Sequence, residues 1–186
     1  MKLSKELNDI LVEQVRRELE SAQVYNGMRI YFKDANYPGA EQWMTVQIFE
    51  EVLHAEDFIN FIQEIGGELP SIGDIAKTKC EYDSMLDVFE HGLEHEFYIS
   101  DSIKACLEQA IEDKNYAAEN FLRTYIDEQL EEEDHFRTQV ETLREIGDNK
   151  SALYKYDEYL GTRSGNLTSP NGAVFAFYTG PQGGEE

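Results

Sequence analysis

Four glutamates occupy positions where a bundle of helices would normally place apolar residues. Glu18, Glu51, Glu96 and Glu132 each interrupt a stripe of mostly apolar side chains that repeats at alternating steps of three and four residues. That spacing marks the face of a helix that is turned towards a core. A carboxylate buried without a partner is costly, and no lysine or arginine lies on these stripe segments. The four glutamates must therefore be neutralised by protons or by metal ions.

Two of these glutamates are followed by a histidine three residues later, in Glu51-x-x-His54 and Glu132-x-x-His135. Residues three apart lie on one helix face, one turn from each other. Four carboxylates would balance the charge of two divalent cations, and neutral imidazoles would add donor atoms without adding charge. Oxygen ligands with a few imidazoles and no sulfur suit iron or manganese. The pattern therefore predicts a site for two metal ions inside the bundle.

Long helices must position these residues, and the hydrophobic pattern predicts where they run. The second helix should end at the left-handed cap of Gly66, and Ser84 with Asp87 resembles a capping box that opens the third. Short links follow the first and third helices, whereas residues 68–82 form a connector long enough to cross a bundle. The expected helices span residues 5–33, 41–65, 85–112, 116–146 and 150–160. These connections predict an all-α four-helix bundle with one long crossover, a short fifth helix and an irregular C-terminal tail.

The composition is that of one acidic, folded domain. The chain has 186 residues, with 38 Asp and Glu against 16 Lys and Arg, and 41% of its residues are hydrophobic. So many hydrophobic residues exclude a disordered acidic tail, and a formal net charge of −22 argues against nucleic acid and anionic membranes as partners. No apolar stretch is long enough to span a membrane, and the N-terminus has no secretory signal. We therefore expect a cytoplasmic protein whose partners are cations or basic surfaces.

With these motifs, the sequence resembles the prokaryotic non-haem ferritins over residues 3–160. The segments that carry the resemblance are RRELESAQVY, WMTVQIFEEVLHAEDF, FEHGLEHE and NFLRTYIDEQLEEE. The resemblance implies a ferritin-like di-iron domain over residues 1–160 and an extended C-terminal tail over residues 161–186. It also implies a homo-oligomer, a 24-subunit cage, in which Fe(II) is oxidised by dioxygen or peroxide and stored as ferric mineral.

The resemblance further implies two iron ions in each subunit. Carried over by position, the first ion is held by Glu18, Glu51 and His54. The second is held by Glu51, Glu96 and Glu132, so that Glu51 bridges the two. Without metal, crowded and buried carboxylates should hold protons, and iron binding would then release them.

Five more residues correspond to positions around this centre. Tyr25 matches the tyrosine beside the di-iron site, and Gln129 matches its polar neighbour. Glu50, Glu128 and Glu131 match a third iron position found on the cavity side of many prokaryotic members. Each of these three glutamates lies one residue off a core stripe, so they form either this third site or a solvated acidic face.

Two departures from the family pattern affect the expected site. His135 gives the fourth helix a second Glu-x-x-His motif, which haem-containing bacterioferritins have and typical non-haem ferritins lack. His135 is therefore either a metal ligand or a solvent-facing neighbour of Asp134. Val52 stands where bacterioferritins carry the haem-binding methionine, so no haem is expected. Thr124 stands at the position where many family members have tryptophan. The electron-donating role of an aromatic residue at this position is therefore in doubt for this chain.

The interpretation that these residues favour is a ferroxidase that stores and detoxifies iron. The main alternative is a di-iron oxidase or peroxidase of the rubrerythrin type that stores none. Rubrerythrins usually add a four-cysteine iron domain, whereas this chain has only Cys80 and Cys106. A helical assembly protein that binds no metal is a further alternative. The mini-ferritins that coat DNA are disfavoured by the acidic charge.

Overall fold

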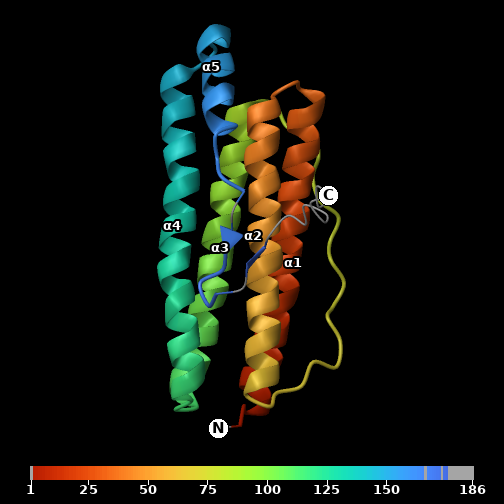
Figure 1. The fold of residues 1–186 in the computed structure, drawn as a ribbon, viewed down its shortest axis with the longest axis vertical. Coiled ribbons are helices and arrows are strands. Elements are labelled where there is room, and N and C mark those ends of the chain that lie inside the picture. Colours follow the sequence, from red (N-terminus) through yellow and green to blue (C-terminus); the bar gives the residue numbers. More distant parts are fainter. Residues whose placement is uncertain (1, 166, 173, 176–186) are drawn as a thin grey trace, which may run out of the picture.

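Figure 1 shows a bundle of long helices that stand side by side, with a shorter helix at one end. The computed structural model describes residues 2–165, 167–172 and 174–175. Helix α1 packs mainly against α2, and α3 packs mainly against α4. Within the described residues, the helices are α1 Lys5–Asp34, α2 Pro38–Glu64, α3 Met85–Glu112, α4 Tyr116–Ile146 and α5 Lys150–Leu160. The predicted all-α four-helix bundle with a short fifth helix is confirmed.

A long crossover joins the α1–α2 pair to the α3–α4 pair. It leaves α2 at one end of the bundle and runs along α1 to the other end, as the yellow segment of Figure 1 shows. Gly27 of α1 permits this close approach, because a Cβ atom there would collide with the carbonyl oxygen of Lys79 in the crossover. As a result α2 and α3 run in the same direction, and their glutamates reach the same height of the bundle.

Helix α2 begins earlier than the sequence pattern indicated. The predicted start was Glu41, but the helix begins at Pro38, where a proline is tolerated because the first-turn N–H groups have no helical partner. The carboxylate of Asp157 in α5 accepts hydrogen bonds from the backbone N–H groups of Gly39, at 3.1 Å, and Ala40, at 2.8 Å. A distant residue therefore caps this helix, which a local pattern cannot reveal.

Two other helix ends agree with the sequence prediction. Gly66, directly after the last turn of α2, has a φ angle of 77°, which is the left-handed conformation expected there. Ser84 caps α3 by accepting a hydrogen bond from the N–H of Asp87, at 3.1 Å. The carboxylate of Asp87 accepts in return from the N–H of Asp83, at 3.0 Å, so the predicted capping box extends by one residue.

The bundle has two apolar cores, one towards each end. Residues from all four long helices fill both, and the two differ in composition because the second is rich in aromatic rings. The first core includes Leu7, Leu11, Val15, Phe58, Ile62, Ile99, Ile103, Leu122 and Tyr125. The second includes Tyr25, Met28, Phe32, Trp43, Met44, Phe89, Phe136 and Val140. Along each helix, the predicted inward glutamate falls between residues of the first core and residues of the second.

The chain after α5 turns back along the bundle, descending between α4 and α2 in Figure 1. It forms two short antiparallel strands, β1 Leu167–Thr168 and β2 Val174–Phe175, within the tail that was expected to be irregular. Leu167 is buried against Val46 and Leu53 on the outer side of α2. The tail also contains the apolar residues 174–178, whose side chains lie outside the described part of the structure.

Candidate metal centre

Each long helix contributes one buried glutamate to a polar layer between the two cores. Glu18, Glu51, Glu96 and Glu132 are between 1% and 3% exposed. The predicted inward orientation of the four glutamates is confirmed by this burial. Their role as metal ligands stays a prediction, because burial alone does not identify what neutralises them.

Glu18, Glu51 and His54 offer ligand atoms that lie within 4.8 Å of one another. Nδ1 of His54 lies 3.4 Å from Oε2 of Glu51, and Nε2 lies 3.6 Å from Oε1 of Glu128. Within the described residues, this is the one group of three acidic or histidine side chains that converges so closely. Two carboxylates and an imidazole at this spacing are a suitable donor set for a divalent iron ion.

One oxygen of Glu18 lacks the partner that a buried acceptor normally has. Oε1 accepts a hydrogen bond from Nε2 of Gln14, at 2.8 Å, whereas Oε2 is buried without a hydrogen-bond partner in the described chain. Buried polar atoms are nearly always satisfied, so such an atom calls for an explanation. A cation held between Glu18, Glu51 and His54 would supply the missing partner, and the residues therefore fit a metal ion.

The other two glutamates are held by neutral hydrogen-bond donors. The hydroxyl of Tyr25 and Nε2 of Gln129, the latter at 3.1 Å, both donate to the carboxylate of Glu96. Nε2 of Gln47 donates to Oε2 of Glu132, at 2.6 Å. Such contacts orient a carboxylate without adding charge, and they are typical of the residues that surround metal ligands.

Three acids of this layer, Glu18, Glu51 and Glu96, resist ionisation when no metal is bound. Burial raises the pKa of Glu51 to about 8, and burial together with the charges of Glu51 and Glu132 raises the pKa of Glu96. Burial also raises the pKa of Glu18. Burial opposes a charge on His54, but the carboxylates of Glu128 and Glu51 outweigh it and raise the pKa of this histidine. Metal binding must therefore displace protons from these groups.

The three residues of the suggested third position lie in different environments. Glu50 and Glu128 are half-buried at the edge of the centre, while Glu131 is exposed. Glu128 approaches His54, and Glu50 forms an ion pair with Arg163 from the tail. Burial and the charge of Glu132 raise the pKa of Glu50 to about 7. The structure thus brings two of these glutamates to the centre and leaves the third in solvent.

His135 does not occupy a position equivalent to that of His54. It is exposed, and it lines a shallow pocket together with Trp43 and Arg163. His54 follows its glutamate at the same spacing but lies within the buried layer. Of the two interpretations left open by the sequence, this placement favours the solvent-facing one.

Three residues with a direct bearing on the centre were not identified as site residues from the sequence. Gln14 and Gln47 each precede an inward glutamate by four residues, at Glu18 and Glu51, and this spacing on a helix face was an available signal. Arg163 contacts Glu50 from the tail, and the sequence contains no local pattern that would connect the two.

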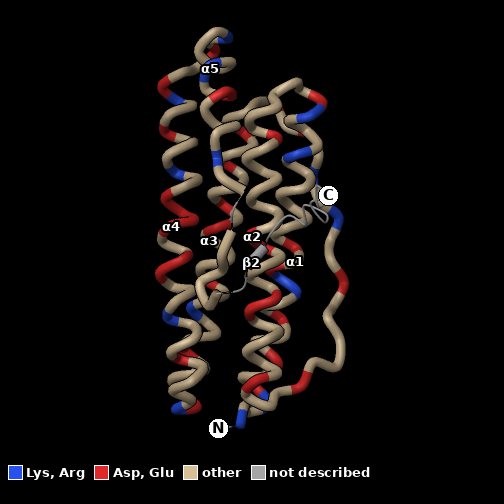
Figure 2. The backbone as a smooth tube through the Cα atoms, viewed as in Figure 1, with Lys and Arg blue, Asp and Glu red and all other residues tan. Residues whose placement is uncertain are grey.

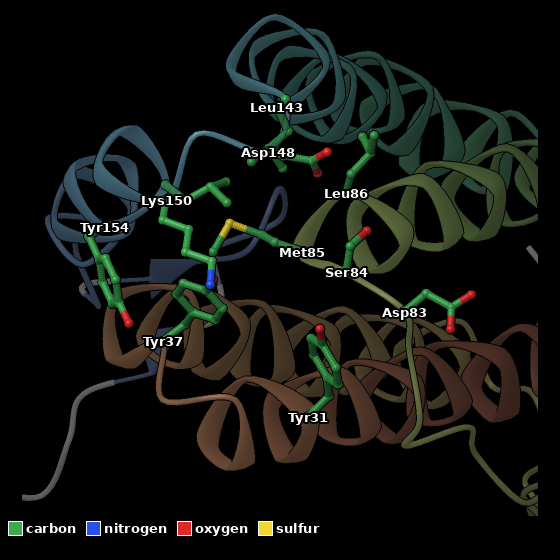
Figure 3. A pocket seen from close by; sticks show the side chains of 12 residues that line it. Tyr31, Tyr37, Asp83, Ser84, Met85, Leu86, Leu143, Asp148, Lys150 and Tyr154 are labelled. Atoms are coloured by element: carbon green, nitrogen blue, oxygen red, sulfur yellow. The ribbon is translucent and has the colours of Figure 1, made fainter.

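A separate cleft lies away from the metal centre. It has a volume of about 540 Å³ and opens between the start of α3, the α1–α2 link and the α4–α5 link. Figure 3 shows that Tyr31 and Tyr37 form one side and Leu143, Asp148 and Lys150 the other. These residues do not form a set of convergent carboxylates, so the cleft does not resemble a second metal site.

Acidic residues are distributed over all four long helices, with few basic residues between them, as Figure 2 shows. No helix in the described part of the chain is long and apolar enough to cross a membrane. A four-helix bundle with one long crossover and a buried layer of inward glutamates is the architecture of ferritin-like carboxylate proteins. The family model of the ferritin-like domain matches residues 8–146, and the chain belongs to the ferritin family.

Several known proteins are similar to this chain over most of its length. The bacterial non-heme ferritin of Staphylococcus haemolyticus is 35% identical over 162 residues, which are 87% of this chain and 97% of that protein. That of Campylobacter jejuni is 33% identical and covers 85% of this chain and 94% of its own. Among solved structures, the open pore ferritin of the archaeon Archaeoglobus fulgidus has a TM-score of 0.85 and 36% identity, covering 87% and 98% of the two chains.

Proposed function

We propose that this protein stores and detoxifies iron, and that it oxidises Fe(II) to Fe(III) at a centre inside each subunit. The observation that carries the proposal is the buried layer of four glutamates with an unpartnered oxygen on Glu18. Membership of the ferritin family and the similarity to bacterial non-heme ferritins support it. The substrates are Fe(II) and dioxygen or peroxide, and no haem takes part.

Two Fe(II) ions occupy the layer in this proposal. Glu18, Glu51 and His54 bind the first ion, and Glu51, Glu96 and Glu132 bind the second, with Glu51 between them. The close approach of Glu18, Glu51 and His54 supports the first set. The charges of Glu51 and Glu132 raise the pKa of Glu96, which supports the second set because it reflects carboxylates crowded into one layer.

The charge balance explains why oxidised iron leaves the centre. Four carboxylates neutralise two Fe(II) ions, which each give one electron to the oxidant. Two Fe(III) ions carry two further positive charges that the four glutamates do not balance. Hydroxide or oxide restores neutrality and favours release as ferric mineral. Tyr25 and Gln129 keep Glu96 in place during this exchange through their hydrogen bonds.

Storage requires a closed compartment, so the proposal includes a homo-oligomeric cage in the cytoplasm. Glu50, Glu128 and Glu131 form a third iron position between the centre and the mineral. Glu50 and Glu128 support this position because they lie half-buried beside His54 and Glu132.

Stopped-flow absorbance after aerobic addition of Fe(II) tests the oxidation step. We expect Glu51→Ala and His54→Ala to slow the appearance of ferric absorbance by at least about 100-fold, since each removes a ligand. Glu56→Ala, which removes an exposed acid from the same helix, should leave the rate unchanged. Wild-type rates in the two ligand variants would contradict the proposal.

Light scattering of the iron-loaded protein tests storage. A closed cage that retains ferric iron is expected. Iron oxidation by a small species that retains no mineral would instead indicate a non-storing oxidase or peroxidase of the rubrerythrin type.

A further inference from the structure

A basic side chain from the tail reaches the edge of the metal centre. Helix α5 ends at Leu160, which is buried, and the next residues turn so that the N–H of Arg163 donates to the carbonyl of Leu160, at 3.3 Å. The turn directs Arg163 towards α2, and its side chain is only 16% exposed. An arginine this well covered is held by specific contacts.

Arg163 contacts three residues on one face of α2. Its guanidinium lies over the ring of Trp43, 4.3 Å from the ring centre. Nη1 donates to Oε1 of Gln47, at 2.6 Å, and Nη2 donates to the carboxylate of Glu50. These positions are separated by four and three residues, so they form a single stripe that ends directly before Glu51.

The contact with Gln47 links Arg163 to the layer of four buried glutamates, here called the inner layer. The amide oxygen of Gln47 accepts from Arg163, and its amide nitrogen donates to Glu132, at 2.6 Å. Arg163 therefore determines which way the amide points. The guanidinium of Arg163 thus neutralises Glu50 at the edge of the centre. It also orients the amide of Gln47, which donates to Glu132 inside the centre.

The tail beyond Arg163 is fastened to two helices. Leu167 is buried against α2. The backbone N–H of Asn171 donates to the carboxylate of Asp57 in α2, at 3.1 Å, and its side-chain amide donates to Thr124 of α4, at 3.3 Å. Thr124 is the position where many family members have tryptophan, and here it anchors the tail. The segment thus crosses the face of the bundle on which Glu50 and Glu128 lie, between α4 and α2 in Figure 1.

We propose that Arg163 acts as a built-in counter-cation at the third iron position, so that an Fe(II) ion has to displace its guanidinium from Glu50 before it can bind there. This inference rests on the proposed function, because it concerns iron that moves between the centre and the mineral. A positive charge at Glu50 repels a third cation and competes for the same carboxylate. Arg163 is thus a positioning residue. It keeps iron in the inner layer until both positions there are occupied, and a further ion then displaces the guanidinium from Glu50.

Anaerobic titration calorimetry with Fe(II) tests this inference by counting bound ions. The wild-type protein should bind two ions per subunit tightly and a third weakly. In Arg163→Ala the third ion should bind at least about fivefold more tightly, because a competing group has been removed. Arg163→Lys keeps a charge at this position and should remain closer to the wild type.

Two further variants separate the explanations. Arg123→Ala removes one exposed positive charge from α4 and should leave the third ion weak. If Arg123→Ala and Arg163→Ala strengthen the third ion equally, general charge accounts for the effect and the inference is wrong. It is also wrong if Arg163→Ala binds the third ion as the wild type does.

Arg163→Gln, which keeps a donor for Gln47, gives the same comparison should the alanine variant fail to fold. It should strengthen the third ion as Arg163→Ala does, and unchanged binding contradicts the inference. If the proposed function itself is wrong, the titration of the wild-type protein gives a different result. In that case the wild-type protein does not bind two ions per subunit, whatever the variants at Arg163 do.

Discussion

Two sets of acids share the middle of this bundle but are neutralised in different ways. In the inner layer, neutral donors such as Gln14 and Gln129 orient the glutamates, and the charge is left for protons or metal ions. The outer set consists of Glu50, Glu128 and Glu131, and in it Glu50 pairs with Arg163 at the edge of the protein. Enclosing a guanidinium in the inner layer would add a large desolvation cost and leave no room for a cation. The comparison shows that the fully buried glutamates are oriented mainly by uncharged amide and hydroxyl donors, whereas the half-buried Glu50 is paired with a cation.

Metal added to the inner layer should have the largest effect on stability. Without oxygen, Mn²⁺ at about a thousand times its dissociation constant should raise the free energy of unfolding by about 4 kcal/mol, because it binds the folded site only. Glu51→Gln should remove most of this increase, whereas Glu56→Gln should retain it because Glu56 is exposed. Chemical denaturation with and without Mn²⁺ measures the difference. Equal increases in both variants would place the bound metal elsewhere.

The pH dependence of the metal-free protein should be somewhat smaller. Burial raises the pKa of Glu51 from 4.5 to about 8, so near neutral pH the folded chain holds a proton that the unfolded chain has lost. The free energy of unfolding should therefore fall as pH rises, by about 1.4 kcal/mol per pH unit, or about 3 kcal/mol between roughly pH 5.5 and 7.5. His54 contributes in the same direction above its ordinary pKa of 6.5, because its folded pKa is raised.

Denaturation of metal-free Glu51→Gln across this range is the measurement. Its stability should fall less steeply with pH than that of the wild type, whereas Glu56→Gln should follow the wild type. His95 acts in the opposite direction below pH 6.5, since burial lowers its pKa to about 4 and it loses its proton on folding. Comparing slopes between variants cancels the His95 contribution. Parallel slopes for Glu51→Gln and wild type would show that Glu51 is ionised in the folded protein.

The smallest of these effects is expected from a neutral donor. Gln129→Ala removes the amide that orients Glu96 and should weaken Mn²⁺ binding by about tenfold, which is the lower range for residues that support metal ligands. Gln63→Ala changes an exposed glutamine on α2 and should leave the affinity unchanged. Anaerobic calorimetry distinguishes the two. An unchanged affinity in Gln129→Ala would show that the inner glutamates keep their geometry without this donor.

The two Glu-x-x-His motifs show what a sequence pattern can and cannot predict about a side chain's burial. Both have the same spacing, which places each histidine on the same side of its helix as the preceding glutamate. The structure buries His54 and leaves His135 exposed. The difference arises because the apolar face of a helix is wider than one residue, so a histidine at its margin lies in the core or in solvent according to how the neighbouring helices pack.

The sequence by itself determined the long helices, the crossover and the four inward glutamates. These features follow from periodicity and from local signals such as Gly66 and Ser84, which act within a few residues. Only the tertiary structure decided that Asp157 caps α2 and that Arg163 pairs with Glu50. These contacts join residues separated by more than 100 positions, and no local preference specifies them. They form because the packing of α5 brings the tail onto α2.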